Sequence, residues 1–316
     1  MKPPVTFSQF IQRRMVLAHK RTRQRAHRLP AVWRGMLWMV ASGIVFSFLN
    51  SVLRWLSMNL DVYQTQFLRY SLGIVVMLPF LFRAGWRAYI PQDIKGQFWR
   101  GAVHTLALIV WFTALPHVTM ADLTAISFTG PIFIMIGAAW FLGEKMRLDR
   151  WIAALVGFSG VVVVVAPHLQ GGGGLYTLLM LASAPMFAVS FLITKTLTRS
   201  ERSSVIVLWQ SIAIALFSLP MGLLNWSNPT WYQWLGFLLS GVLGSVGHYM
   251  VARGIRVTDV SATQSLRFLD LIWASLVGWL VFADIPSKTT VLGAIVILCS
   301  TIWIARRERT TAQSIA

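Results

Sequence analysis

The sequence has little cysteine and little acid: one Cys and ten Asp plus Glu in 316 residues. The single Cys299 excludes an internal disulfide framework and a site built from several thiolates. Charged residues make up only 12% of the chain, whereas soluble domains usually carry about a quarter. Too few charges are present to cover a soluble protein of this length, so composition favours a membrane protein.

Several functional motifs are also missing from the sequence. It has no Gly-x4-Gly-Lys-Ser/Thr segment for nucleotide phosphates and no His, Cys or carboxylate cluster with metal-ligand spacing. Asp270 is the one carboxylate deep inside an apolar run, and His104 and His248 are far apart in sequence. An intramembrane enzyme would need a Ser/His, paired Asp or His/Glu constellation. We therefore expect neither enzymatic activity nor a cofactor.

Long apolar runs are abundant, and a membrane helix needs about 20 mostly apolar residues. Turn-forming sequences separate the runs, and most connections are short. The sequence predicts ten transmembrane helices at about 35–57, 63–82, 98–116, 121–141, 151–167, 175–197, 204–224, 231–252, 260–283 and 289–305.

The net charge of +18 lies in segments between these runs. That distribution favours a membrane protein over a partner of nucleic acid. With the N-terminus in the cytoplasm, 24 of the 28 Lys and Arg residues fall on the cytoplasmic side, as the positive-inside rule requires. We expect a multi-pass protein of the cell inner membrane with both termini in the cytoplasm.

The two halves of the chain resemble each other. Glu144 and Asp284 each follow an apolar run and lie 140 residues apart. Because five helices is an odd number, the second half must enter the membrane upside down, as in many secondary transporters. The predicted fold is an all-α membrane protein of two inverted five-helix repeats. Its expected parts are a basic tail (1–33), a first repeat (34–168), a second repeat (169–306) and a C-terminal tail (307–316).

Three segments carry a family resemblance: 67–70 (FLRY), 115–122 (LPHVTMAD), and Gly130-Pro131 followed by 141–144 (FLGE). They resemble the EamA repeat of the drug/metabolite transporter superfamily. The resemblance covers about residues 35–306 and implies a ten-helix carrier. Within the superfamily the chain is similar to uptake carriers for small metabolites such as S-adenosylmethionine or riboflavin. The second half departs from the motif, with Leu271 where the first half has Pro131.

Polar groups inside the apolar runs are the candidate substrate ligands, since a charge in the hydrocarbon region is costly. Arg267 and Asp270 have the i, i+3 spacing that places both on one helix face. A substrate contact and a self-neutralising ion pair are both open readings of this pair. Arg69 offers a planar fork of donors to a carboxylate or phosphate, or else locks its own helix. The full candidate set is Asn50, Gln66, Arg69, Tyr70, His104, Trp111, Phe128, Gln264, Arg267, Asp270 and Trp273.

The leading hypothesis is a secondary active transporter for a small organic metabolite. Arginines outnumber Asp270 inside the apolar runs, so we expect an anionic or zwitterionic substrate, with riboflavin and S-adenosylmethionine as examples. The alternative is a lipid or nucleotide-sugar flippase or exchanger on the same fold. The expected partners are the substrate and membrane lipids, with no nucleic acid and with a homodimer as a further option.

Overall fold

The structure is a computed structural model that describes residues 30–114, 126, 128–145, 147–165, 174–282 and 288–315. These residues form helices and no strand, which confirms the predicted all-α class for this part of the chain. The elements are α2 (Ala31–Ser57), α3 (Val62–Ala84), η1 (Trp86–Tyr89), α4 (Ile94–Ala114), α6 (Gly130–Leu142), α7 (Leu148–Val165), α8 (Leu175–Leu197), α9 (Ser203–Leu224), α10 (Trp231–Val257), α11 (Val260–Gln264), η4 (Ser265–Phe268), α12 (Leu269–Phe282) and α13 (Lys288–Ile315).

Local sequence signals set several helix ends. Asp61 caps α3, because its Oδ1 accepts the backbone N–H groups of Tyr63 at 2.9 Å and Gln64 at 3.0 Å. Gly143 ends α6 with φ +66°, a left-handed conformation that glycine adopts without steric cost. The chain then turns at Glu144 before α7 begins.

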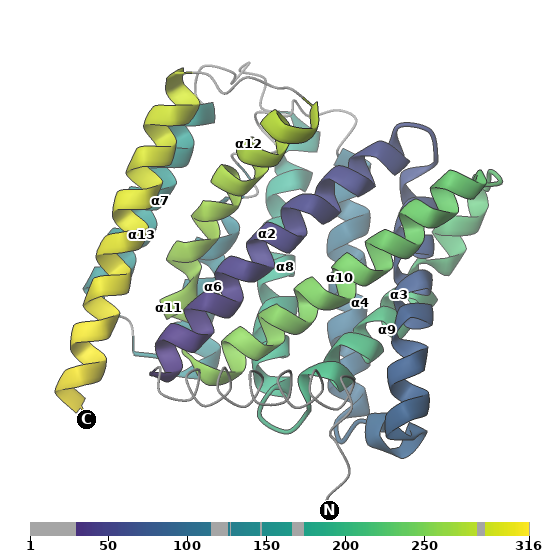
Figure 1. The fold of residues 1–316 in the computed structure, drawn as a ribbon, viewed down its shortest axis with the longest axis horizontal. Helices are drawn as coiled ribbons and strands as arrows, with labels where there is room; N and C mark the ends of the chain where they lie inside the picture. Colours follow the sequence, from purple (N-terminus) through teal and green to yellow (C-terminus); the bar gives the residue numbers. More distant parts are fainter. Residues whose placement is uncertain are drawn as a thin grey trace, which may run out of the picture.

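The two halves of the bundle run in opposite directions. α2 begins and α10 ends at the lower face in Figure 1, called the basal face below, where Gly35 lies against Thr258. The far ends of these helices also meet, because Gly236 of α10 lies against Trp55 of α2. α8 ends at the basal face as well, since Lys195 Nζ donates to the Thr258 carbonyl at 2.7 Å. α2, the first helix of the first half, therefore begins at the basal face, whereas α8, the first helix of the second half, ends there.

The helix contacts follow the same relationship. In the two repeats α2 corresponds to α8, and α4 corresponds to α10. α2 packs against α10, and α8 packs against α4. The pairs α3–α9 and α7–α13 each join equivalent helices, and α6 contacts α8 as α12 contacts α2. Exchange of the two halves leaves this pattern unchanged, as expected for inverted repeats.

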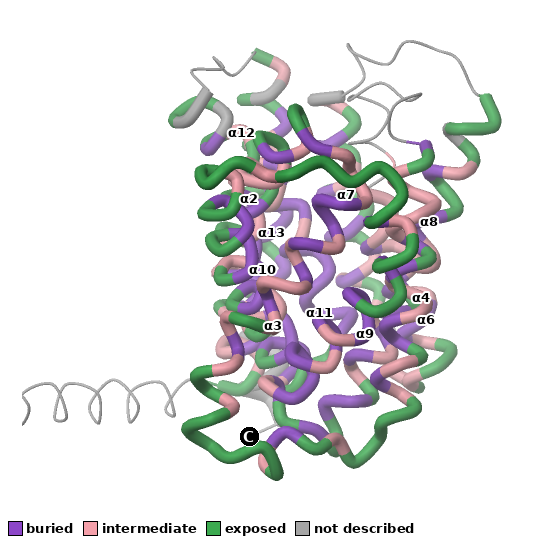
Figure 2. Tube along the Cα trace, turned by 90° about the vertical axis from the view of Figure 1, so that its right-hand side faces the viewer, coloured by how far each residue is buried: buried purple, intermediate pink, exposed green. Residues whose placement is uncertain are grey.

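The outer surface of the bundle is apolar. Figure 2 shows buried residues through the middle of the bundle, with exposed residues along its outside and at the chain turns. Large apolar side chains that are mostly exposed include Phe80, Trp140 and Leu280. Five of the described helices are long and apolar enough to cross a membrane: α2, α3, Leu178–Leu197 of α8, α9 and α10. α6 is apolar but shorter.

Candidate functional site

The ninth apolar run is broken where its charged residues lie. We expected one continuous helix over 260–283, but the structure divides the described part of it into α11, the 3-10 segment η4 and α12. The backbone N–H of Leu269 bonds to the Leu266 carbonyl, which is the i to i−3 pattern of a 3-10 turn. Arg267 lies in η4 and Asp270 in the first turn of α12. Breaks of this kind often mark functional positions in helices.

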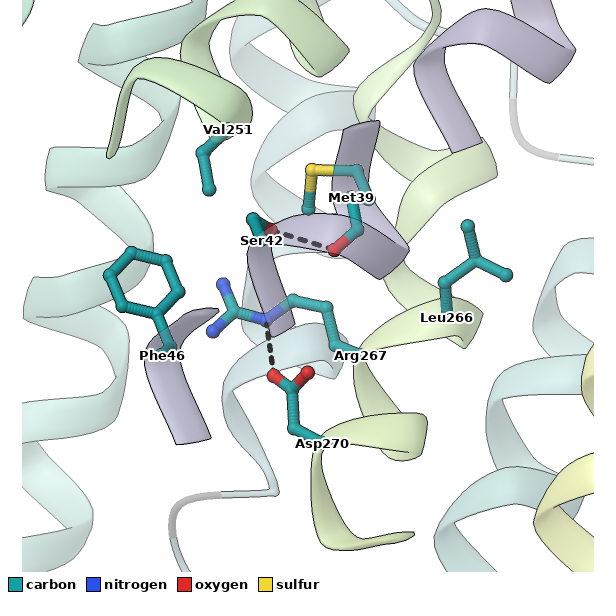
Figure 3. A pocket seen from close by; sticks show the side chains of 7 residues that line it. All are labelled: Met39, Ser42, Phe46, Val251, Leu266, Arg267 and Asp270. Carbon is teal, nitrogen blue, oxygen red and sulfur yellow. Dashed lines mark hydrogen bonds and ion pairs between the residues drawn. The ribbon is translucent and has the colours of Figure 1, made fainter. Parts of the chain in front are cut away.

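Arg267 and Asp270 face each other in a small pocket. Arg267 Nε lies 3.9 Å from Asp270 Oδ2, and each side chain is about one-third exposed. Figure 3 shows both side chains directed into the space between η4, α12 and the facing helices α2 and α10. The residues that line this pocket are Met39, Ser42, Phe46, Val251, Leu266, Arg267 and Asp270.

Gly43 of α2 allows α12 to approach this closely. A Cβ placed on Gly43 would overlap Asp270 Oδ1 and would lie 3.2 Å from Trp273 Cδ1. Trp273 therefore borders the same contact, and its Nε1 is buried with no hydrogen-bond partner among the described residues. Only glycine leaves room at this position for the carboxylate to keep its place.

A second polar group connects four helices in the interior. His104 Nδ1 of α4 lies 3.1 Å from Ser190 Oγ of α8. The His104 and His248 rings have centroids 6.4 Å apart, in an edge-to-face arrangement. His248 Nε2 of α10 lies 3.4 Å from Gln210 Nε2 of α9, and Gln210 Oε1 accepts from Arg100 Nη2 at 2.7 Å. The two histidines are far apart in the sequence, and the fold brings their rings close together.

Aromatic rings join the two polar groups. The Phe46 ring, which lines the Asp270 pocket, lies 5.1 Å from the His248 ring. The Arg267 guanidinium lies 5.9 Å from the Phe191 ring of α8. Both halves therefore contribute polar residues to two neighbouring groups that the Phe46 ring separates. We call these residues together the central polar layer: Arg69, Arg100, His104, Gln210, His248, Arg267 and Asp270.

Arg69 and its neighbours on α3 extend this layer. The Arg69 guanidinium lies 4.8 Å from the Tyr70 ring centroid, and its Nε and Nη2 approach α10 at Gly244. Gly244 lies one helical turn before His248 on α10, which places Arg69 beside the same stretch of α10. Gln66, one turn before Arg69, is 4% exposed, and neither of its amide atoms has a hydrogen-bond partner among the described residues.

The other predicted residues lie in different surroundings. Gln264 is buried, with Nε2 donating to the Val260 carbonyl at 3.1 Å. Trp111 packs edge to face on Phe112, and Phe128 stacks on Phe268. Asn50 is exposed on α2. None of Asn50, Trp111 and Phe128 lines the Asp270 pocket, and the predicted motif at 115–122 lies outside the described residues.

Sequence reasoning missed Arg100 and Gln210. The charge count placed Arg100 among the cytoplasmic residues, although it lies at the start of the predicted run 98–116. In the structure α4 begins at Ile94, so Arg100 falls in its second turn and is 5% exposed. The useful signal was Gln210, a lone amide in the strongly apolar run of α9.

The basal face holds contacts between the two halves. Glu144 of the first half accepts the backbone N–H groups of Val260 at 2.8 Å and Ser261 at 3.0 Å. Arg150 donates to Ser261 Oγ at 2.7 Å and to Asp259 Oδ2 at 3.1 Å. Arg150 is 5% exposed. These hydrogen bonds connect the turn between α6 and α7 to the start of α11.

An apolar outer surface, helices in two opposed halves and a group of polar side chains within the interior define a class, the multi-pass membrane proteins. In the residues that the structure describes, no group of three or more His, Cys, Asp and Glu could hold a metal ion. The model of the EamA-like transporter family matches residues 33–166 and again 174–306. The chain belongs to this family, whose name indicates transport rather than catalysis.

Curated relatives have transporter names as well. The chain is 34% identical to a riboflavin transporter of Rhizobium johnstonii, over 87% of this chain and 91% of that one. It is 30% identical to a riboflavin transporter of Vibrio cholerae, over 88% and 97% of the two chains. It is 27% identical to an S-adenosylmethionine uptake transporter of Rickettsia prowazekii, over 90% and 97%. A solved protein structure superposes with a TM-score of 0.73 at 18% identity, covering 87% of this chain and 96% of that chain, and supports the fold.

Proposed function

We propose that this chain is a secondary active transporter that carries a small organic metabolite across the inner membrane by alternating access. Riboflavin is the first cargo to test. The observation that carries the proposal is the central polar layer, which lies where two oppositely directed five-helix halves meet. Two such halves can rock against each other and open the layer to each side in turn.

The basal contacts fit one end state of this cycle. Glu144, Arg150 and the start of α11 bridge the halves at the basal face. Opening that face would separate these groups, whereas opening the opposite face would leave them joined. We infer that the structure represents a state in which the basal side is closed.

The membrane placement is part of the proposal. We propose ten crossings, divided into repeats at 34–168 and 169–306, with the basal face and both termini in the cytoplasm. The described residues form ten helical units when α11, η4 and α12 are counted as one and the short η1 is left out. These units and the distribution of Lys and Arg along the sequence support the proposal. Some described helices are not long and apolar enough to be recognised as membrane-spanning by themselves. They belong to the same pattern of exchanged helix pairs as the five helices that are.

Charge in the layer and the named relatives guide the choice of cargo. Three arginines share the layer with one aspartate, which favours ligands with carbonyl or anionic oxygen atoms. Riboflavin has two ring carbonyls, and S-adenosylmethionine has a carboxylate. The relatives named as riboflavin transporters include the two at 34% and 30% identity, so riboflavin is tested first and S-adenosylmethionine second.

Counterflow in proteoliposomes tests this function. Purified protein is reconstituted into vesicles loaded with unlabelled riboflavin, and entry of labelled riboflavin is followed against protein-free vesicles. We expect saturable, protein-dependent accumulation that excess external riboflavin abolishes. The same assay with S-adenosylmethionine provides the second arm. No saturable counterflow of either compound would contradict the assignment, and movement of labelled lipid between leaflets in its place would favour the exchanger alternative.

A further inference from the structure

Gln66 is a buried amide with no hydrogen-bond partner in the described part of the chain. Its side chain is 4% exposed, and both Nε2 and Oε1 lack partners among the described residues. A primary amide in a dry interior is costly unless its donor and acceptor are used. A leucine or methionine would fill the same space without that cost. The amide is therefore suited to a ligand that enters the interior and supplies both missing hydrogen bonds.

Arg69 lies on the same side of α3, one turn further along. Residues three apart on a helix are neighbours, so the amide and the guanidinium lie side by side on one face of α3. The guanidinium lies beside Gly244 of α10, where an added Cβ would be 3.6 Å from Nε and from Nη2. The Tyr70 ring centroid lies 4.8 Å from its central carbon, so Tyr70 and the small Gly244 border the planar fork of Arg69.

The chemistry of the two side chains selects one kind of ligand edge. A glutamine amide offers an acceptor and a donor side by side, and it pairs best with a ring edge that carries a neighbouring N–H and C=O. A guanidinium donates to a further oxygen through its fixed fork. A cyclic imide, with one N–H between two carbonyls, satisfies all three requirements. The ring system of riboflavin ends in such an imide.

We propose that Gln66 and Arg69 form the specificity site of this carrier and recognise the imide edge of a planar heterocycle. Gln66 accepts from the ring N–H and donates to one carbonyl, while Arg69 donates to the other. The inference rests on the proposed function for its choice of cargo. It adds the part of the ligand that is recognised and the residues that recognise it.

Riboflavin and N3-methylriboflavin form a matched pair of ligands, because the methyl group removes only the imide N–H. Their dissociation constants are measured by flavin fluorescence titration for the detergent-purified wild-type protein and for Gln66→Met, which keeps the length of the side chain. We expect wild-type protein to bind the methylated ligand about tenfold more weakly, equivalent to about 1.4 kcal/mol. Gln66→Met should bind riboflavin about tenfold more weakly and should show a ratio near one between the two ligands.

Gln97→Met is the matched control. Gln97 is also fully buried, and neither of its amide atoms has a partner among the residues that the structure describes. It lies in the first turn of α4 and not beside Arg69. This variant should keep the wild-type ratio between the two ligands. Thermal unfolding confirms that each variant is folded.

The outcomes separate the two proposals. Equal binding of both ligands by wild-type protein, or a wild-type ratio retained in Gln66→Met, would overturn the specificity site while leaving riboflavin as cargo. Loss of the ratio in Gln97→Met as well would also overturn it, because the effect would then not belong to position 66. No binding of riboflavin by wild-type protein would contradict both the cargo and the site.

Discussion

Glu144 and Ser261 join the two halves of the protein at the basal face. One oxygen of the Glu144 carboxylate accepts both the backbone N–H of Ser261 at 3.0 Å and its hydroxyl at 2.7 Å, and the other accepts the N–H of Val260 at 2.8 Å. A carboxylate at a helix N-terminus satisfies backbone donors that the helix itself leaves free. Here the carboxylate comes from one repeat and the helix from the other.

Glu144→Ala should weaken the basal contact and the protein. Three hydrogen bonds to a charged acceptor are lost, and we expect a loss of about 2 kcal/mol in the free energy of unfolding. Chemical denaturation in detergent measures this loss. Glu144→Gln keeps an acceptor oxygen and should lose less. Equal stability of Glu144→Ala and wild-type protein would show that the contact contributes nothing to holding the halves together.

Asp270→Asn tests the coupling of transport to protons. The substitution keeps the shape of the side chain and removes its charge, and the Arg267–Asp270 pair is partly exposed, so the protein should remain folded. We expect uptake to lose any dependence on an imposed proton gradient. The measurement compares uptake into proteoliposomes with and without that gradient. A gradient dependence equal to that of wild-type protein would exclude Asp270 as the coupling residue.

Gly43→Ala should disturb the Asp270 pocket by steric conflict. The new methyl group would overlap Asp270 Oδ1, so α2 and α12 must separate or the carboxylate must turn away. Overpacking of this kind usually costs about 1–3 kcal/mol, so we expect a lower unfolding temperature. We also expect slower uptake, because the residues that line the pocket must move. Thermal unfolding and uptake are measured on the same preparations.

Gly174→Ala is the control for that prediction. Gly174 precedes α8 with φ −115°, and a Cβ placed there meets nothing within 4 Å. This variant should behave like wild-type protein. If Gly43→Ala were also indistinguishable from wild-type protein, the close approach of α2 and α12 would not matter for function.

Gln210→Leu should destabilise the protein through Arg100. The substitution leaves the buried guanidinium without the acceptor that now lies 2.7 Å from its Nη2. Loss of a hydrogen bond to a buried charged group costs about 1.5–3 kcal/mol, which denaturant unfolding can measure. Gln97→Leu is the comparison, because the amide of Gln97 has no partner among the described residues, and this variant should be neutral or more stable. The opposite order would contradict the proposed role of Gln210.

The sequence determined the helical class and most helix positions. Apolar runs interrupted by turn-forming residues gave helices at the expected places, since a chain in hydrocarbon must satisfy its backbone hydrogen bonds internally. The similarity of the two halves and the odd number of helices in each also predicted their opposed directions, which follow from chain alternation alone. The Arg267–Asp270 spacing predicted their proximity, because i and i+3 residues are close in both an α-helix and a 3-10 turn.

Only the tertiary structure decided which polar residues meet. His104 and His248 are 144 residues apart, and their rings approach because α4 and α10 lie next to the same helices, α8 and α9. Arg100 is an interior residue because α9 packs against α4, and Arg100 Nη2 donates to Gln210 Oε1 there. Glu144 accepts hydrogen bonds from the start of α11 in the other repeat. Periodicity and composition describe each helix by itself, whereas contacts between helices depend on how the two halves pack, and a single sequence does not encode that packing in any local pattern.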